Sequence, residues 1–390
     1  MLYRTPKLDE PETEVVDSIE SLRKRLSRQI GGSPRRWYGM LRRNALARAI
    51  QGSNSIEGYN VSVEDAIAAA EGEEPLETDA ATWAEIVGYR NAMTYVLQLS
   101  DDQHFAFTSG LLRSFHFMML QHDLTKNPGR WRPGAIFVRN DERGEIVYEG
   151  PDVDLVPQLM TDLVVWLRKG DPKAPAIVRA AMAHLNLVMI HPYSDGNGRM
   201  ARCLQTLVLA REGILAPHFC SIEEYLGRNT QAYYDVLGAV GAGSWHPERD
   251  ARPWLRFVLT AHYRQAQTLL RRVRESERVW DSLEKIVADR GLPDRTICAL
   301  YDATFGFRVR NSTYRPAAEV SENVASRDLT RLVEVKLLVP KGEKRGRYYT
   351  ASPLIRNVRE RASEPRRLVD DPFDPASGVL SSGQQQLFSQ

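Results

Sequence analysis

A run of twelve residues, from His191 to Arg202, gathers the side chains that a reaction on a phosphate ester needs. It holds a histidine, an aspartate, an asparagine between two glycines, and two arginines. A histidine can accept a proton near neutral pH, and a carboxylate can hold Mg²⁺. Small residues let backbone N–H groups face an anion, and arginines bind phosphate oxygens. The run therefore predicts phosphate chemistry.

The flanking residues predict that this run lies at a corner between two helices. Residues 176–190 carry apolar side chains at helical spacing, and residues 199–211 carry a second apolar stripe that Gly213 is suited to end. A helix that begins at the glycines adds the positive end of its dipole to an anion site. Arg199 and Arg202 are three residues apart, so they are neighbours on one helix face.

Other readings of the glycines are weaker. Residues 196–201 fit the dinucleotide-binding pattern G-x-G-x-x-A, but that pattern requires a preceding strand, and here a helix is expected. The phosphate-binding pattern G-x-x-x-x-G-K-[ST] is absent from the sequence. A simple polar turn would explain the Asn-Gly pair but not the histidine, the aspartate and the arginines around it.

The run resembles the core motif of the Fic family of nucleotidyl transferases, H-P-[FY]-x-[DE]-G-N-G-R-x-x-R. Every specified position is met, with Tyr193 where phenylalanine is more usual. The resemblance implies a general base that deprotonates a target hydroxyl, a Mg²⁺ ligand, an anion cradle and two clamps on the outer phosphates of ATP. These roles fall, in that order, to His191; to Asp195; to Gly196, Asn197 and Gly198; and to Arg199 and Arg202. Members that phosphorylate carry a lysine in place of Gly198, so the resemblance favours AMP transfer.

A second motif, Ser-Asn-Ser-Ile-Glu-Gly, lies at residues 53–58. Ser53 and Glu57 are four residues apart and share one helical face, and Gly58 fits the left-handed position that ends a helix. The motif is similar to the family's inhibitory helix, [ST]-x-x-x-E-[GN], expected here over about 45–58. The resemblance implies that Glu57 pairs with Arg202 and holds the enzyme inactive. A solvated surface helix is the alternative.

Two short apolar runs, 136–138 and 146–148, flank the turn-forming segment 140–144 and predict a β-hairpin. The family has such a flap beside its active site, where a segment of the target can add as a strand. An ordinary surface hairpin is the alternative. His184, on the helix before the core motif, is expected to be a packed or hydrogen-bonded histidine and not a second base.

Length and composition set the outer limits. With 390 residues, two or three domains are expected. Lys and Arg number 52 and Asp and Glu 50, so the formal charge of +2 gives no general attraction to nucleic acid or membrane. Three cysteines without disulfide or metal-ligand spacing indicate a reducing compartment. No signal peptide and no long apolar span is evident, so we expect a cytoplasmic protein without membrane contact.

The expected fold is mainly α: a helical Fic-type core with a β-hairpin flap, followed by a small winged helix-turn-helix domain. The expected organisation is a flexible arm (1–15), an N-terminal helical region (16–110), the Fic catalytic core (111–275), the winged helix-turn-helix (279–353) and a disordered tail (363–390). The tail assignment depends on its Pro-, Ser- and Gln-rich composition.

The winged helix-turn-helix is predicted from three short helical patterns, 294–302, 314–318 and 321–334, followed by strands at 337–339 and 348–350. The pattern resembles the C-terminal module of many Fic proteins. Six basic residues could meet DNA phosphates, namely Arg327, Arg331, Lys341, Lys344, Arg345 and Arg347. Five acidic residues dilute them, so DNA binding and a protein-docking or oligomerisation role, including a homodimer, stay open.

Together these features predict a protein adenylyltransferase that uses ATP and Mg²⁺. It would modify a Ser, Thr or Tyr hydroxyl of a target protein, the chain itself included. Two alternatives remain: the same site removes AMP from modified proteins, with Glu57 orienting a water, or the chain is a DNA-binding regulator that senses nucleotide.

Overall fold

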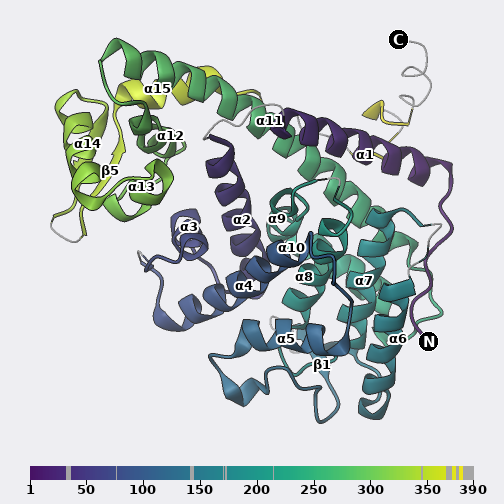
Figure 1. Ribbon diagram of the computed structural model, residues 1–390. Helices are drawn as coiled ribbons and strands as arrows, with labels where there is room; N and C mark the ends of the chain where they lie inside the picture. Colours follow the sequence, from purple (N-terminus) through teal and green to yellow (C-terminus); the bar gives the residue numbers. More distant parts are fainter. Residues whose placement is uncertain are drawn as a thin grey trace.

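In the computed structural model the protein is mainly helical (Figure 1). The structure describes residues 1–31, 37–75, 77–140, 145–169, 171, 174–213, 215–343, 346–365, 371–374 and 377–380. The helices of this part of the chain are α1 (Glu10–Gly31), α2 (Trp37–Ile56), α3 (Val63–Glu71), α4 (Ala80–Leu99), α5 (Ser109–Leu120), α6 (Val156–Lys169), α7 (Ala176–Ile190), α8 (Asn197–Ala210), α9 (Glu223–Arg228), α10 (Thr230–Gly241), α11 (Arg252–Asp289), α12 (Ile297–Thr304), α13 (Asn311–Ala318), α14 (Glu322–Glu334) and α15 (Pro353–Ala362). The strands are β1 (Phe137–Asn140), β2 (Glu145–Glu149), β3 (Gly243–Ser244), β4 (Leu338–Lys341) and β5 (Tyr348–Ala351).

Helices α7 and α8 form the centre of the core. Both are buried along almost their whole length, and they pack against each other, with α6 and α11 on α7 and α4 on α8. The indole of Trp254, on α11, is fully buried and donates to the carbonyl of Ala181 at 2.8 Å. The expected corner is confirmed: α7 ends at Ile190 and α8 begins at Asn197, so the core motif spans the connection between these two buried helices.

The predicted hairpin is confirmed. Strands β1 and β2 pair antiparallel, with an irregularity between Val138 and Arg139; of the predicted turn segment 140–144, residues 141–144 lie outside the described residues. The two-residue strand β3 adds parallel to β2, which sequence patterns did not indicate. The sheet order β1-β2-β3 leaves β1 at an edge of this sheet.

The first fifteen residues are not a flexible arm, which corrects the expectation for 1–15. Tyr3 is buried, and its N–H donates to the side chain of Asn186 on α7 at 2.8 Å. Helix α1 begins at Glu10 and packs along α11. The physical reason is that a few side chains of this mostly polar segment pack into the core, among them Tyr3 and the fully buried Val15. The overall composition of the segment does not indicate this packing.

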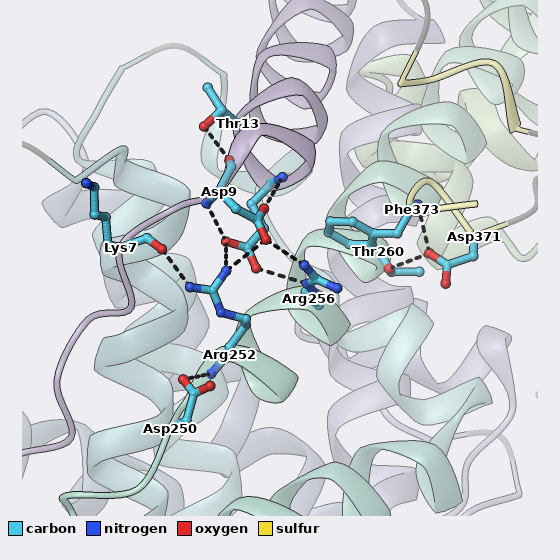
Figure 2. A network of polar contacts seen from close by, with 10 residues as sticks. Lys7, Asp9, Thr13, Asp250, Arg252, Arg256, Thr260, Asp371 and Phe373 are labelled. Atoms are coloured by element: carbon cyan, nitrogen blue, oxygen red, sulfur yellow. Dashed lines mark hydrogen bonds and ion pairs between the residues drawn. The ribbon is translucent and has the colours of Figure 1, made fainter. Parts of the chain in front are cut away.

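A four-residue charge cluster anchors this segment (Figure 2). Arg252 Nη1 lies 3.0 Å from Asp9 Oδ2 and 2.8 Å from Glu12 Oε2. Arg256 Nη2 lies 2.7 Å from Asp9, and Arg256 Nε lies 2.9 Å from Glu12. The two arginines balance the two carboxylates, and Glu12, which is fully buried, depends on them for its counter-charge.

The described part of the tail also departs from the expected disorder over 363–390. The guanidinium of Arg256 lies 5.2 Å from the centre of the Phe373 ring, next to Asp371 (Figure 2). Val379 is buried. Phe373 thus contacts α11 and Val379 is part of the buried core, while the rest of the tail lies outside the described residues.

The long helix α11 joins the core to a C-terminal module made of α12–α15, β4 and β5 (Figure 1). Three helices followed by an antiparallel β4–β5 pair appear in the predicted order. Arg295 and Asp328 join the first and third helical segments, with Nε and Oδ2 2.7 Å apart. Lys344 and Arg345, two of the predicted basic residues, lie outside the described residues. The winged-helix assignment stays a prediction.

Helix α2 is fixed at its N-terminal half by one buried arginine. Arg43 Nη1 lies 2.9 Å from Glu71 Oε1 on α3, and Nη2 lies 2.5 Å from Asp302 Oδ1 on α12. Helix α3 is capped by Ser62, whose hydroxyl accepts from the N–H of Asp65 at 3.0 Å. Helix α2 therefore contacts α3, the C-terminal module and, at its other end, the core motif.

Candidate active site

The imidazole of His191 is held with one nitrogen available. His191 ends α7 in a left-handed conformation (φ 50°), and its N–H donates to Leu187 O at 3.0 Å. Ring atom Nδ1 lies 3.0 Å from Val188 O, and because a carbonyl only accepts, Nδ1 carries the proton. Burial lowers the pKa of His191. The neutral ring thus leaves Nε2 as a proton acceptor at neutral pH.

The turn of the core motif is shaped by Asn197 and Gly196. The Asn197 amide closes a loop on Tyr193, accepting from its N–H at 2.9 Å and donating to its carbonyl at 2.8 Å. Gly196 is left-handed (φ 75°), and a Cβ there would lie 3.1 Å from Leu120 Cδ1. The Asn197 amide is therefore hydrogen-bonded within the loop on both its oxygen and its nitrogen. Donors for an anion are instead the backbone N–H groups of the first turn of α8, which have no acceptor within the helix.

Arg199 and Asp195 are joined to two residues that sequence reasoning missed, Glu85 on α4 and Lys126. Arg199 Nη1 is in direct contact with Glu85 Oε2, and both side chains are buried. Lys126 Nζ lies 2.8 Å from Asp195 Oδ2. Burial alone would raise the pKa of Glu85, but Arg199 and Lys126 lower it to about 2. Burial likewise acts against the Asp195 charge, and Lys126 and Arg199 still lower its pKa.

The predicted inhibitory residues lie on Arg202. Arg202 Nη2 lies 2.6 Å from Glu57 Oε1, Nε donates to the Ser53 hydroxyl at 2.8 Å, and Nη2 also donates to Ser53 O at 3.0 Å. Arg202 is buried, whereas the side chain of Glu57 is 26% exposed. Gly58 follows with φ 86°, as its position after the end of α2 predicts. The structure thus brings together two segments that are about 145 residues apart.

Gly198 is the point of closest approach between the core motif and Glu57. A Cβ on Gly198 would lie 2.5 Å from Glu57 Oε1 and 3.0 Å from Arg202 Nη1. A larger side chain at this position would therefore have to displace the glutamate. The absence of a side chain at Gly198 is a structural condition for the Glu57–Arg202 pair.

Helix α2 reaches this position because two glycines let it approach α9. A Cβ on Gly52 would lie 2.7 Å from the backbone carbonyl carbon of Glu223, and one on Gly227 would lie 2.7 Å from Gly52 O. Glu223 is buried and accepts from Thr206 at 3.0 Å, and its burial raises its pKa to about 7. Backbone contact between α2 and α9 places Ser53 and Glu57 on Arg202.

Two further residues that sequence reasoning missed support the motif loop. His116 stacks on Tyr193 with ring centres 3.7 Å apart; it accepts from Gly129 N at 2.8 Å on Nδ1, so Nε2 donates to Asp195 O at 3.0 Å. Burial lowers the pKa of His116 to about 4. Arg132 is buried and donates to the backbone carbonyl of His191 at 3.0 Å. The only sequence signal near them is the turn-rich segment 127–134.

His184 and the three cysteines behave as expected. His184 is fully buried, with Nδ1 2.8 Å from Gln205 Oε1 and Nε2 3.0 Å from the Tyr233 hydroxyl, which confirms a packed histidine. Cys203, Cys220 and Cys298 are free and buried.

Known proteins share this domain. Residues 106–209 match the Fic/DOC family. The chain is 30% identical over 262 residues to the protein adenylyltransferase Fic of Nematostella vectensis, covering 65% of this chain and 55% of that protein. It is 29% identical over 177 residues to protein adenylyltransferase fic-1 of Caenorhabditis elegans, covering 45% and 31%. The chain thus spans about half or less of the length of these curated relatives.

Solved structures agree on the fold. A Fic family protein from Desulfovibrio desulfuricans G20 superposes with a TM-score of 0.58 at 22% identity, covering 90% of this chain and 98% of the other. A Fic domain containing signaling protein from Bacteroides thetaiotaomicron VPI-5482 gives a TM-score of 0.51 at 19% identity, covering 67% and 96%.

The helical core, the hairpin and the motif at the α7–α8 corner define a Fic-type fold. Residues 106–209 form a Fic domain, and this domain carries the complete core motif. Among the helices that the structure describes, none combines the length and the apolar character that crossing a membrane requires.

Proposed function

We propose that this chain is a protein adenylyltransferase that transfers AMP from Mg·ATP to a hydroxyl of a target protein. The observation that carries the proposal is the juxtaposition, at one helix corner, of a histidine with a free ring nitrogen and a helix N-terminus suited to an anion. The Fic relatives named as protein adenylyltransferases support the same reaction. The target protein would carry a Ser, Thr or Tyr residue.

His191 acts as the general base in this proposal. Its Nδ1 proton is committed to Val188 O, so Nε2 takes the proton of the attacking hydroxyl. The backbone N–H groups at the start of α8 would hold the phosphates through the helix dipole and direct hydrogen bonds. Transfer at phosphorus depends on alignment and charge neutralisation, and these residues supply both.

The donor set at Asp195 fits Mg²⁺. Mg²⁺ keeps several waters and is held by one or two carboxylates together with substrate phosphates. Within the described residues no group of three or more His, Cys, Asp or Glu side chains forms a metal site, and the 39% exposed carboxylate of Asp195 meets the single-carboxylate case. When bound, the metal would neutralise phosphate charge. Asp195 would hold it, and the N–H of Gly196 orients that carboxylate at 2.6 Å.

The resting chain is inhibited in this proposal, because Glu57 occupies Arg202. Arg202 would otherwise bind an outer phosphate of ATP, and a carboxylate 2.6 Å away competes for the same guanidinium. Arg199 is the second proposed phosphate clamp, although the pairing with Glu85 shows that it already has one acidic partner. Lysine should not fully replace either planar guanidinium.

The test is incubation of the full chain with ATP labelled on the α-phosphate and a cell lysate, followed by mass spectrometry of labelled proteins. Transfer of AMP by the natural chain or by Glu57→Gly, and its loss in His191→Ala, would support the proposal. Label on no protein, the chain itself included, with Glu57→Gly at saturating Mg·ATP would contradict it.

AMP removal by the same site is the second candidate, and the 26% exposure of the Glu57 side chain favours it, since a water can reach the carboxylate. Turnover of a purified AMP-modified protein would be compared with turnover of ATP. A faster first reaction that is lost in Glu57→Gly would assign the chain to removal.

DNA binding by the C-terminal module is proposed with protein docking as its rival. Arg327 and Arg331 would contribute phosphate contacts, so their replacement by alanine should lower duplex affinity and flatten its salt dependence. The absence of any salt-sensitive duplex binding by the intact chain would assign the module to protein contacts, a homodimer included.

Cytoplasmic localisation is proposed together with the enzymatic function and is tested by cell fractionation.

A further inference from the structure

Four charged side chains around the core motif form a closed ring of alternating sign. Lys126 Nζ lies 2.8 Å from Glu85 Oε1 and 2.8 Å from Asp195 Oδ2. Arg199 contacts Glu85 directly, and its Nη2 lies 3.8 Å from Asp195 Oδ2. His122 Nε2 lies 3.3 Å from Glu85 Oε1. Two cations and two carboxylates therefore balance each other in one cluster.

The two halves of this ring differ in burial. The Arg199 and Glu85 side chains are 1% and 6% exposed, whereas those of Lys126 and Asp195 are 24% and 39% exposed. Lys126 lies at the end of a 3-10 turn (Leu124–Lys126), outside the helices of the core. A flexible, partly hydrated ammonium is thus the member that can leave at the lowest cost.

The proposed function assigns Mg²⁺ to Asp195, and in the structure Lys126 contacts Oδ2 of this residue. An ammonium at 2.8 Å neutralises that carboxylate and occupies the space next to Oδ2. A divalent ion bound to Asp195 would lie beside the same positive charge, and the two would repel each other at close range. Lysine and metal therefore compete for this carboxylate.

We propose that Lys126 is an internal counter-ion of the metal site, which holds Asp195 until Mg²⁺ displaces it and so sets the Mg²⁺ concentration at which the site loads. This inference rests on the proposed function, which assigns Asp195 to the metal. Glu85 remains neutralised when Lys126 leaves, because Arg199 stays in contact with it. The exchange therefore leaves no buried carboxylate without a cation.

The test measures metal binding without nucleotide. The full chain is titrated with Mn²⁺ and free Mn²⁺ is followed by electron paramagnetic resonance. Lys126→Met should bind Mn²⁺ at least about tenfold more tightly than the natural chain, because a positive charge has left the site. Lys126→Arg, which keeps the charge, should restore the natural affinity. Asp195→Asn added to Lys126→Met should abolish the gain, and Lys169→Met, at an exposed lysine of α6, should have no effect.

An equal or weaker Mn²⁺ affinity in Lys126→Met would overturn the proposal. Lys126→Gln gives a second, polar replacement in case the methionine variant does not fold, and it should show the same gain. Binding of α,β-methylene-ATP, which cannot release AMP, provides the other arm. Nucleotide affinity that falls in Lys126→Met at every Mg²⁺ concentration, with Mn²⁺ affinity unchanged, would make Lys126 a phosphate ligand instead. Because neither arm measures AMP transfer, failure of the proposed reaction would leave the metal result readable.

Discussion

Replacement of Glu57 by glycine should activate AMP transfer, because it removes the carboxylate that occupies Arg202. The bond between Arg202 Nη2 and Glu57 Oε1 is 2.6 Å long. A hydrogen bond to a charged group contributes about 1.5–3 kcal/mol, which corresponds to roughly 10- to 150-fold in a population. Since the Glu57 side chain is 26% exposed, water screens the pair. We therefore expect the lower part of that range, about 10- to 30-fold.

The assay is the initial rate of AMP transfer at fixed Mg·ATP, together with ATP affinity by calorimetry. Both should rise in Glu57→Gly, and Glu57→Asp should fall between, because the shorter side chain reaches the guanidinium less well. Glu74→Gly is the matched control, since Glu74 is exposed in the loop after α3. The combination of Glu57→Gly with His191→Ala should transfer nothing, which separates activation from a side reaction.

One result would refute this reasoning. If Glu57→Gly is folded, binds ATP no more tightly and transfers AMP no faster than the natural chain, the pairing with Arg202 is not inhibitory. Thermal unfolding with and without ATP supplies the folding control. In the variant Arg202 keeps its bonds to Ser53 but loses its charge partner, so the melting temperature should fall without ATP and recover more strongly with it.

His191→Ala should lower AMP transfer by about 10²–10⁴-fold with unchanged ATP binding; near-normal transfer would exclude the ring as the base. Because burial lowers the pKa of His191 below its usual 6.5, the ring stays neutral as the pH falls through 6.5, and the acid limb of the pH–rate profile should lie below that value. Gly52→Ala should force α2 away from α9, costing about 1–3 kcal/mol in urea unfolding and raising transfer, whereas Gly39→Ala, with open space around its Cβ, should do neither. Glu85 has a pKa lowered to about 2 from 4.5, so its stabilisation is complete above pH 4.5 and lost as the pH falls toward 2. Glu85→Gln should therefore remove up to about 3 kcal/mol of acid dependence in urea unfolding between these values, and an unchanged slope would show that the pairing contributes little.

The sequence predicted the core motif and its corner because their determinants are local. The apolar stripe of α7 and the glycines at the start of α8 lie in, or directly beside, the helices that they help to form, and both helices were found where expected. The contact of Glu57 with Arg202 followed from the family resemblance, since no local pattern links residues 145 positions apart. The hairpin was likewise predicted from its turn and its two apolar runs.

The supporting residues could not be predicted for the opposite reason. Glu85 meets Arg199 across 114 positions, and His116 meets Asp195 across 79. Each of them is a single polar residue on a helix, where a solvated position is the usual expectation. The first fifteen residues failed in the same way: Asp9 resembles a solvated acid until α11 returns, 243 positions later, with Arg252.

The Arg43 contacts determine which movement can free Arg202 at low cost. Shifting α2 as a rigid rod would separate Arg43 from Glu71 and Asp302, and breaking a buried pair of this kind costs about 3–5 kcal/mol. Unwinding the last turn of α2 instead breaks a few backbone hydrogen bonds, such as Glu57 N–H to Asn54 O at 3.0 Å, which water can replace. Activation then consists of fraying of the C-terminal end of α2, while the rest of this helix keeps its position. Amide hydrogen exchange should accordingly be fast in residues 54–59 and slow through the rest of α2, whatever the state of the site.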